Sequence, residues 1–248
     1  MPGFKDHFSA QAREYATYRP TYPGALFDWL AGQAPHRRWA WDCGTGSGQA
    51  AVELADRFAR VVATDPSDSL LAHARVHEGV HYATMTAESA ALAAASVDMV
   101  TVAQAIHWFD APGFYSEVRR VLVPGGVIAV WAYGLLSVDA GMDAIIREFY
   151  TNRVGPYWPD ERAIVDAGLG SIPFPFAEID APTFAMEATW TLEQFAGYVR
   201  TWSAVHRYVV ARGEDPVDVL VDQLRPLWGE TRCVTWPLDL RAGTSNGS

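Results

Sequence analysis

The chain has 248 residues, 50% of them hydrophobic, and this length is enough for one large domain that buries its own core. Its 19 basic and 29 acidic residues give a formal net charge of -10, so its surface repels phosphates and we expect no nucleic-acid partner. It has two cysteines, no secretory-signal pattern and no apolar run of the roughly 18 to 20 residues that a spanning helix needs, which predicts a cytoplasmic protein with free thiols and no membrane contact.

The first half of the chain alternates between apolar segments and segments with helical spacing. A short helix is expected at residues 26–33, ahead of the first strand. Five strands are expected, at residues 39–43, 60–65, 80–88, 97–105 and 127–133. Helices between the strands are expected from Gln49 onward, at residues 68–77 and at residues 114–122. This alternation predicts a doubly wound, mostly parallel α/β sheet.

The second half changes character and is richer in helices. Helices are expected at residues 139–153, after a capping box that begins at Thr191, and from Asp215 onward. Strands are expected at residues 176–187 and 233–242. Each of these strands contains a proline, which disfavours an interior position, so we place both at one edge of the sheet. The helices then form a cap inserted after the fifth strand.

Three glycines occupy alternate positions in the segment WDCGTGSG, residues 41–48, between the first strand and the next helix. At such a turn Gly44, Gly46 and Gly48 permit tight backbone geometry and let a ligand approach the amides. The dinucleotide fingerprint would need a glycine in place of Gln49, so NAD is a weaker candidate. The alternative interpretation is a turn that serves packing alone.

Two acidic residues lie near these glycines. Asp42 precedes Gly44 and would repel a pyrophosphate but attract a ligand with an ammonium or sulfonium group. Asp65 ends the second strand, where a carboxylate can accept hydrogen bonds from both hydroxyls of a ribose or, alternatively, cap the next helix. The pair therefore favours a ligand that carries a cationic group and a ribose.

Five segments, in this order and at these intervals, resemble the class I S-adenosylmethionine-dependent methyltransferases of the type 11 group: DCGTGSG, ATDPS, TAE, VDMVTVAQAIHWFD and EVRRVLVPGG. Three more segments resemble the trans-aconitate methyltransferase-like branch: YATYRPTYP, AIHWF and WTLEQFAGYVRTWSAV. The resemblance covers residues 4–242 and implies a Rossmann-like sheet of seven strands with the last one antiparallel. It also implies S-adenosyl-L-methionine as cofactor, a small-molecule acceptor, no metal, and a monomer or homodimer.

The resemblance divides the chain into four parts. Residues 1–38 form an N-terminal lid and first helix, and residues 39–136 form the core that binds the cofactor. Residues 137–242 form the helical cap with the late strands, and residues 243–248 form a flexible tail.

Within the core, the resemblance gives each segment a role. Gly44 and Gly46 hold the methionyl part of the cofactor, Asp65 holds the ribose, and the TAE segment holds the adenine. Thr86 stands where many relatives have an acidic residue that accepts from the adenine amino group, so Thr86 itself, Glu88 or a backbone carbonyl must accept here. The preferred adenine contact is the amide of Ala87. The predicted cofactor-binding residues are Asp42, Gly44, Thr45, Gly46, Gly48, Asp65, Pro66, Ala87, Glu88 and Gln104.

Methyl transfer from a sulfonium needs alignment and exclusion of water, and it needs a base only if the acceptor is not already anionic. A carboxylate is ionised at neutral pH, whereas deprotonating a phenol of pKa about 10 costs about 4 kcal/mol. His107 follows the fourth strand and is a predicted catalytic residue, as a base or as a hydrogen-bond donor. Alternatively, His107 forms a packed wall with Trp108 and Phe109.

The segment YRPTYP occupies residues 18–23, and in the family such a stretch folds over the cofactor site as a lid. Tyr18 and Arg19 are therefore predicted catalytic residues, with the Arg19 guanidinium binding a carboxylate of the acceptor. The alternative is an arm that only covers apolar surface. The predicted acceptor-binding residues are Tyr15, Tyr22, Trp108 and Arg200, and the further candidates for the opposite wall are Trp158, Trp190, Trp202 and His206.

The predicted activity is methyl transfer from S-adenosylmethionine to a small molecule, with a carboxylate among the acceptors considered. Two other functions stay open at this point. One is a noncatalytic module that binds an adenosyl ligand or a partner on the same fold. The other is a nicotinamide-dependent oxidoreductase, which Gln49 and Asp42 disfavour.

Overall fold

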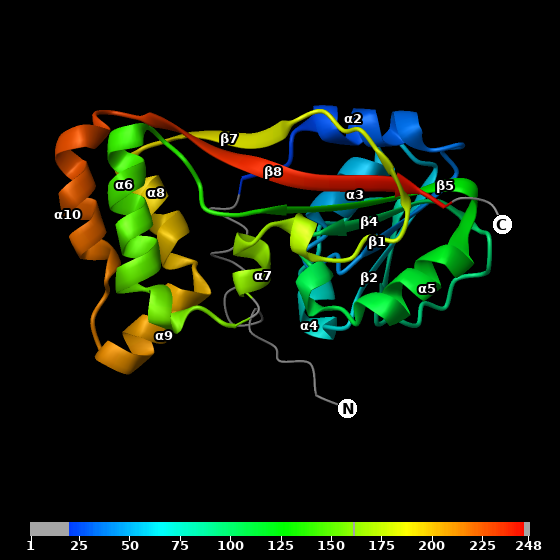
Figure 1. Cartoon of the computed structure of the whole chain (residues 1–248), viewed down its shortest axis with the longest axis horizontal. Coiled ribbons are helices and arrows are strands. Elements are labelled where there is room, and N and C mark those ends of the chain that lie inside the picture. Colours follow the sequence, from blue (N-terminus) through cyan, green and yellow to red (C-terminus); the bar gives the residue numbers. More distant parts are fainter. Residues whose placement is uncertain (1–19, 161, 246–248) are drawn as a thin grey trace.

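The computed structural model describes residues 20–160 and 162–245. Its centre is one sheet in the order β3-β2-β1-β4-β5-β8-β6, with β7 paired to β8 beyond this row (Figure 1). The first five strands run parallel, and β8 is antiparallel to β5, β6 and β7. The strands are β1 (Trp39–Cys43), β2 (Arg60–Asp65), β3 (Val80–Thr84), β4 (Val97–Ala103), β5 (Leu122–Tyr133), β6 (Ala177–Ile179), β7 (Phe184–Trp190) and β8 (Arg232–Thr244).

Helices cover both faces of this sheet. Buried side chains of α2 (Gly24–Gln33) and α3 (Gln49–Ala55) share one hydrophobic cluster, and those of α5 (Ala111–Val121) belong to a second cluster on the other side. The single-turn helix α4 (Asp68–Leu71) follows β2. The doubly wound arrangement predicted from the alternating pattern is therefore confirmed.

The remaining helices form the cap. Figure 1 shows α6, α8, α9 and α10 gathered at one end of the sheet, with α7 between them and the strands. Buried side chains of α6, α8, α9 and α10 join the same hydrophobic cluster as α2 and α3, and that of α7 joins the cluster of α5, so cap and core are packed together. The cap elements are α6 (Ala140–Glu148), the π-helical turn η3 (Phe149–Arg153), the 3-10 turn η4 (Gly155–Tyr157), α7 (Arg162–Asp166), the 3-10 turn η5 (Leu169–Ser171), α8 (Leu192–Arg200), α9 (Ser203–Arg212) and α10 (Val217–Trp228).

The sheet differs from the expected one in having eight strands rather than seven. The segment expected to be one strand at residues 176–187 forms two, β6 and β7, because the chain leaves the ladder around Pro182. The expectation that both late strands lie at the edge is wrong for β8, which lies between β5 and β6. Pro237 is tolerated because pairing with β5 ends at Leu238, so at Pro237 the strand has only Ala185 of β7 as its ladder partner.

Several element boundaries also differ from the expected ones. β4 ends at Ala103 rather than at residue 105, and β5 begins at Leu122 rather than at residue 127. The helix expected at residues 68–77 ends at Leu71, and the amide of Arg75 instead donates to the carbonyl of Ser47. The strand expected at residues 80–88 ends at Thr84. β8 continues through Thr244, which pairs with Val127, and thus takes the first residues of the segment expected to be a flexible tail.

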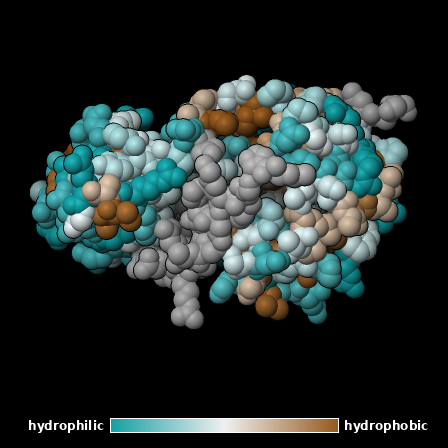
Figure 2. Space-filling model, turned by 90° about the horizontal axis from the view of Figure 1, so that it is seen from below, coloured by the Kyte–Doolittle hydropathy of each residue, from teal (hydrophilic) through white to brown (hydrophobic). Residues whose placement is uncertain are grey.

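The surface is mostly hydrophilic on the face seen in Figure 2, where hydrophobic residues form separate small patches. None of the helices in residues 20–160 and 162–245 combines the length and apolar character needed to cross a bilayer. Cys43 is buried and Cys233 is exposed, and both are free thiols.

Candidate functional site

The glycine-rich turn between β1 and α3 forms the first part of the site. The amides of Gly44 and Thr45 both donate to the carbonyl of Thr64, at 2.8 and 2.9 Å, which ties the turn to the end of β2. Gly44, Gly46 and Gly48 all have positive φ, of 70°, 54° and 77°. This left-handed conformation explains why glycine occupies each position.

The three glycines nevertheless have different surroundings. A Cβ at Gly44 would lie 2.6 Å from the Cβ of Ala105, and one at Gly48 would overlap the hydroxyl of Tyr82. A Cβ at Gly46 would meet no heavy atom of the described residues within 4 Å. Gly44 and Gly48 are therefore required by packing, whereas the backbone at Gly46 faces space that a ligand could occupy.

Asp42 is fully buried at the end of β1, with 1% of its surface exposed. Its two carboxylate oxygens accept hydrogen bonds from the hydroxyls of Thr45 and Thr101, at 2.6 and 2.7 Å. Burial raises the pKa of Asp42 from its usual 3.8 to about 6, since these hydroxyls offset only part of the lost hydration and the Asp65 charge adds repulsion. A cationic group bound beside Asp42 would stabilise the ionised form.

Asp65 ends β2 and is 6% exposed. Its carboxylate accepts hydrogen bonds from the amides of Gly46 and Ser67, at 3.0 and 2.9 Å. Ser67, not Asp65, is the N-cap of α4, because its hydroxyl accepts from the amide of Leu70. The alternative of Asp65 as an N-cap is therefore wrong, and Asp65 instead joins the glycine turn to the turn after β2, where Pro66 is exposed.

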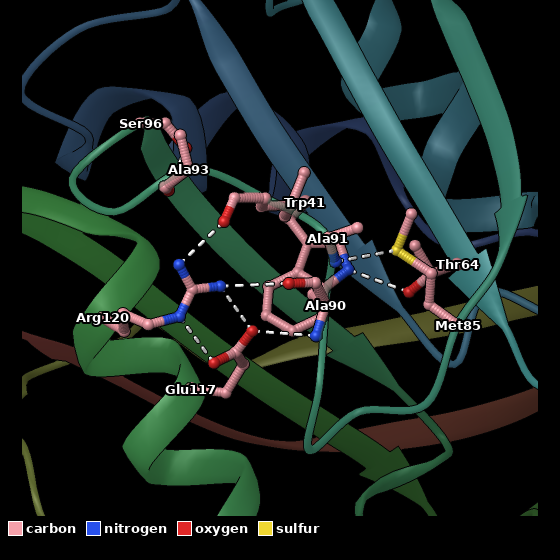
Figure 3. Close-up of polar contacts among 10 residues, drawn as sticks. Trp41, Thr64, Met85, Ala90, Ala91, Ala93, Ser96, Glu117 and Arg120 are labelled. Atoms are coloured by element: carbon pink, nitrogen blue, oxygen red, sulfur yellow. Dashed lines mark hydrogen bonds and ion pairs between the residues drawn. The ribbon is translucent and has the colours of Figure 1, made fainter.

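The TAE segment lies in the loop after β3. The amide of Ala90 in this loop donates to Glu117 of α5 at 2.8 Å, and Arg120 donates to the carbonyls of Ala90 and Leu92 at 3.0 and 2.7 Å (Figure 3). The hydrogen bond from Arg120 lowers the pKa of Glu117, so this anchor is ionised at neutral pH. The loop that carries the predicted adenine contacts is thus held against α5.

Within this loop, Ala87 is buried and Glu88 is half-buried. The carboxylate of Glu88 accepts a hydrogen bond from the amide of Asp110 at 3.0 Å, directly before α5. Thr86 is exposed and forms an isolated bridge with Ser89. Glu88 therefore has a structural contact of its own, which leaves the Ala87 amide as the better candidate for adenine.

The chain after β4 brings the predicted catalytic histidine to the same edge of the sheet. Gln104 has a left-handed backbone with φ of 58°, and its amide and side chain donate to the carbonyls of Trp131 and Tyr133, at 2.9 and 3.1 Å. The 3-10 turn η2 (Ile106–Trp108) follows and holds His107 beside Trp108, with ring centroids 4.9 Å apart. A non-glycine residue in this conformation often marks a functional turn.

A cavity of about 110 Å³ opens where β4 and β5 end, between the sheet and the cap. A single buried water needs roughly 10 to 15 Å³, so the cavity has room for a small molecule. Gln104, His107 and Trp108 line it from the core side. Cap residues and the end of β5 supply most of the remaining wall, which is largely aromatic: Tyr133, Tyr150, Trp158, Tyr198 and Trp202.

The structure brings some predicted residues to this cavity and leaves others away from it. His107, Trp108, Trp158 and Trp202 line it. Tyr22 is buried against Trp131 in the core, with ring centroids 5.6 Å apart. The residues Tyr15, Tyr18 and Arg19 lie outside the described residues.

Arg200 is also not among the described residues that line the cavity. Its guanidinium forms ion pairs with Asp215 and Asp218 at 2.6 and 2.8 Å. Both carboxylates precede or begin α10, so Arg200 joins α8 to α10 rather than facing an acceptor. Its predicted role in substrate binding has no support from this position.

Tyr150, Arg162 and Tyr198 are among the cavity-lining residues that the sequence did not predict. Tyr150 lies in the π-helical turn η3, a local irregularity that is frequent at functional sites. The only sequence signal was the density of aromatic residues around Tyr157 and Trp158, which indicated a loop but no direction for its side chains.

No group of three or more histidine, cysteine, aspartate or glutamate side chains within the described ranges is placed to hold a metal ion. Burial and the neighbouring Asp42 raise the pKa of the Cys43 thiol well above its usual range, which disfavours a thiolate nucleophile.

We expect Asp42→Asn to stabilise the protein in a pH-dependent way. Because the folded-state pKa of Asp42 is raised, its ionisation costs stability as the pH rises from 3.8 to about 6, and it costs nothing below 3.8, where both states are protonated. The gain in free energy of unfolding should grow by up to about 3 kcal/mol between roughly pH 4 and pH 8. Urea denaturation at both pH values measures the difference in free energy of unfolding between Asp42→Asn and wild type. A difference that does not change with pH would contradict a pKa of Asp42 raised by burial.

Alanine substitutions at Gly46 and Gly48 should distinguish a glycine that faces open space from one that is required by packing. Both variants force alanine into positive φ, at about 1 to 2 kcal/mol each. Gly48→Ala should cost about 1 to 3 kcal/mol more, because Tyr82 must move and lose its 2.7 Å hydrogen bond to the carbonyl of Arg75. Thermal melting compares the stability of the two variants. The additional loss of stability in Gly48→Ala should be smaller when Tyr82 is also replaced by alanine. Equal losses of stability in Gly46→Ala and Gly48→Ala would contradict the packing role of Gly48.

The family model described as a methyltransferase domain matches residues 41–130. A protein of Dictyostelium discoideum that is named as a methyltransferase is 32% identical over 225 residues, which cover 89% of this chain and 86% of that protein. Methyltransferase cfoB of Aspergillus candidus is 32% identical over 205 residues, covering 70% of this chain and 64% of that protein.

Solved structures agree with this relationship. A structure from Anaeromyxobacter dehalogenans, named as a type II methyltransferase, superposes with a TM-score of 0.88 at 44% identity and covers 92% of this chain and 98% of that chain. The YcgJ protein of Bacillus subtilis, at 17% identity and a TM-score of 0.54, supports the fold alone, over 91% of this chain and 100% of that chain. The oxidoreductase and noncatalytic alternatives lose their support, and the chain belongs to the class I S-adenosylmethionine-dependent methyltransferases of the type 11 group.

Proposed function

We propose that this methyltransferase methylates a small molecule that binds in the cavity between the sheet and the cap. The observation that carries the proposal is the position of this cavity, because Gln104 and His107 line it directly after β4. In an open α/β sheet, ligands bind at the carboxyl ends of the strands. The glycine turn, Asp42 and Asp65 lie at the same edge, so a cofactor there would adjoin an acceptor in the cavity.

The residues at this edge fit S-adenosylmethionine. The space at Gly46 permits close approach to the backbone, and the buried Asp42 carboxylate favours a cationic ligand. We propose that Asp42, Gly44, Thr45, Gly46 and Gly48 bind the methionyl part. Asp65 and Pro66 would bind the ribose, Ala87 and Glu88 the adenine, and Gln104 the region next to the acceptor.

When bound, the cofactor supplies an electrophilic methyl group on a sulfonium. The chain's own task is to align the acceptor and exclude water, which in well-oriented systems contributes up to roughly 7 to 11 kcal/mol. A carboxylate acceptor needs no base, so for it His107 would act as a hydrogen-bond donor; for a phenol or an alcohol His107 would act as the base. Trp108 would form part of the wall in both cases.

Several finer predictions belong to the same proposal. The roles of Tyr15, Tyr18 and Arg19 as a lid over the site, the relationship to the trans-aconitate methyltransferase-like branch, a cytoplasmic location and a monomeric or homodimeric state stay predictions. Membership in this family and the small cavity are consistent with a metabolite as acceptor.

Binding of S-adenosylhomocysteine should require Asp65. Asp65→Ala removes an acceptor of charge-assisted hydrogen bonds and frees the Gly46 amide, so we expect affinity to fall about tenfold or more, at about 1.5 to 3 kcal/mol per bond. Calorimetry measures the affinity for S-adenosylhomocysteine. Asp56→Ala is the control, because Asp56 is an exposed aspartate whose carboxylate lies near His77 and is not among the predicted site residues. A mass-spectrometric screen of metabolites for cofactor-dependent methyl transfer identifies the acceptor. Unchanged affinity in folded Asp65→Ala would exclude Asp65 from the site.

Substitution of His107 should affect turnover more than cofactor binding. With any acceptor found in that screen, His107→Ala should lower kcat about 100-fold if His107 is the base. His107→Gln retains a hydrogen-bond donor, so a donor role predicts that His107→Gln keeps most of the activity lost in His107→Ala. Full turnover in His107→Ala, with normal affinity for S-adenosylhomocysteine, would show that His107 only forms the wall.

A further inference from the structure

Arg162 is the one permanently charged side chain among the described residues that line the cavity. It begins α7, and its side chain is 21% exposed. Its guanidinium carbon lies 5.0 Å from the ring centroid of Trp158 and 5.6 Å from that of Tyr150. The guanidinium is thus held against two aromatic rings of the cavity wall.

One edge of this guanidinium is fixed by a small polar network. The Nε atom donates to the hydroxyl of Tyr150 at 2.8 Å and to Asp166 at 3.0 Å. The Tyr150 hydroxyl in turn donates to the Asp166 carboxylate, at 2.8 Å from each oxygen. Both hydrogen bonds that Arg162 donates use Nε, so they set the plane of the guanidinium without using its terminal nitrogens.

The other edge has a different environment. Within residues 20–160 and 162–245, neither Nη1 nor Nη2 of Arg162 has a hydrogen-bond partner. No aspartate or glutamate of the described chain lines the cavity, and Asp166 is outside the lining. Four N–H groups in a fixed plane therefore remain available to a ligand, and an anion in the cavity meets no lining carboxylate.

We propose that the terminal nitrogens of Arg162 bind a carboxylate of the acceptor, while the apolar body of the acceptor lies among the aromatic rings of the cavity. This inference rests on the proposed function, because it assigns the acceptor class to the same cavity. A planar guanidinium matches a carboxylate with two parallel hydrogen bonds, and the rings of Trp158, Tyr150 and Trp202 suit a flat apolar group. Tyr150 and Asp166 are positioning residues for Arg162.

The test uses 4-fluorobenzoate and its neutral counterpart 4-fluorobenzamide as probes, with saturating S-adenosylhomocysteine and fluorine NMR to measure binding. Wild-type protein should bind the benzoate at least tenfold more tightly than the benzamide. Arg162→Gln should abolish this preference and leave benzamide binding within about twofold. Tyr150→Phe should weaken the benzoate preference only in part, because Asp166 still fixes Nε.

Arg212→Gln is the matched control. Arg212 also donates from Nε to a tyrosine hydroxyl, that of Tyr157 at 2.9 Å, but it is exposed on α9 and is not part of the cavity lining. This variant should keep the full benzoate preference. If Arg162→Gln does not fold, Arg162→Lys, which keeps the charge but loses the planar fork, should still bind benzoate less tightly than wild type.

Equal binding of the two probes to wild-type protein, or an undiminished benzoate preference in folded Arg162→Gln or Arg162→Lys, would overturn the proposal. These outcomes are separable from failure of the proposed function. One result would be that S-adenosylhomocysteine binds and methyl transfer is found, while substitution of Arg162 leaves benzoate affinity unchanged. The methyltransferase assignment then stands, and the carboxylate site at Arg162 does not. If benzoate binding depends on Arg162 but no acceptor is methylated in the cavity, the anion site stands and the proposed acceptor site does not.

Discussion

The buried carboxylate of Asp42 is the constraint on which the site depends. It lies at the end of the central strand β1, and within the described part of the chain its direct polar partners are two threonine hydroxyls. Neutral hydroxyls offset only part of the cost of removing a charge from water, which is why the pKa of Asp42 rises to about 6. A fold that places an acid here has a built-in preference for a cationic ligand, and the sulfonium cofactor of this family is cationic.

Asp65 is also buried, and it complements Asp42 because its carboxylate organises the backbone around it. Its hydrogen bonds to the amides of Gly46 and Ser67 join the turn after β1 to the turn after β2. The loop after β3 is held separately, by Glu117 and Arg120 of α5. These three turns converge because parallel strands present their carboxyl ends at one edge. The proposed cofactor site is therefore held together by hydrogen bonds within the chain itself.

The cavity between the sheet and the cap depends on a different feature, the long strand β8. Its last part pairs with β5 in the core, and its first part pairs with β7, which leads into α8 of the cap. One continuous strand thus positions the cap above the ends of β4 and β5. Arg162 and Tyr150 reach the cavity from the cap, whereas His107 reaches it from the core. β8 thus joins the two halves of the cavity wall, and the hydrophobic cluster shared by the cap helices and the core packs them together.

The sequence alone determined the parts of this protein that depend on local pattern. Alternating apolar and helical segments predicted the doubly wound sheet. The spacing of Asp42, the glycines and Asp65 predicted that these residues lie together at one edge of the sheet, because each is at the end of a strand or directly after it. The tertiary structure decided the rest. Pro237 suggested an edge strand, yet β8 is interior. The proline is tolerated there because pairing with β5 ends at Leu238, and Pro237 has only β7 beside it. Arg200 and Arg162 look alike in the sequence, but one joins two cap helices and the other lines the cavity. The direction of a side chain in the cap depends on packing between segments that are distant in the sequence. The periodicity of a single segment therefore does not predict it.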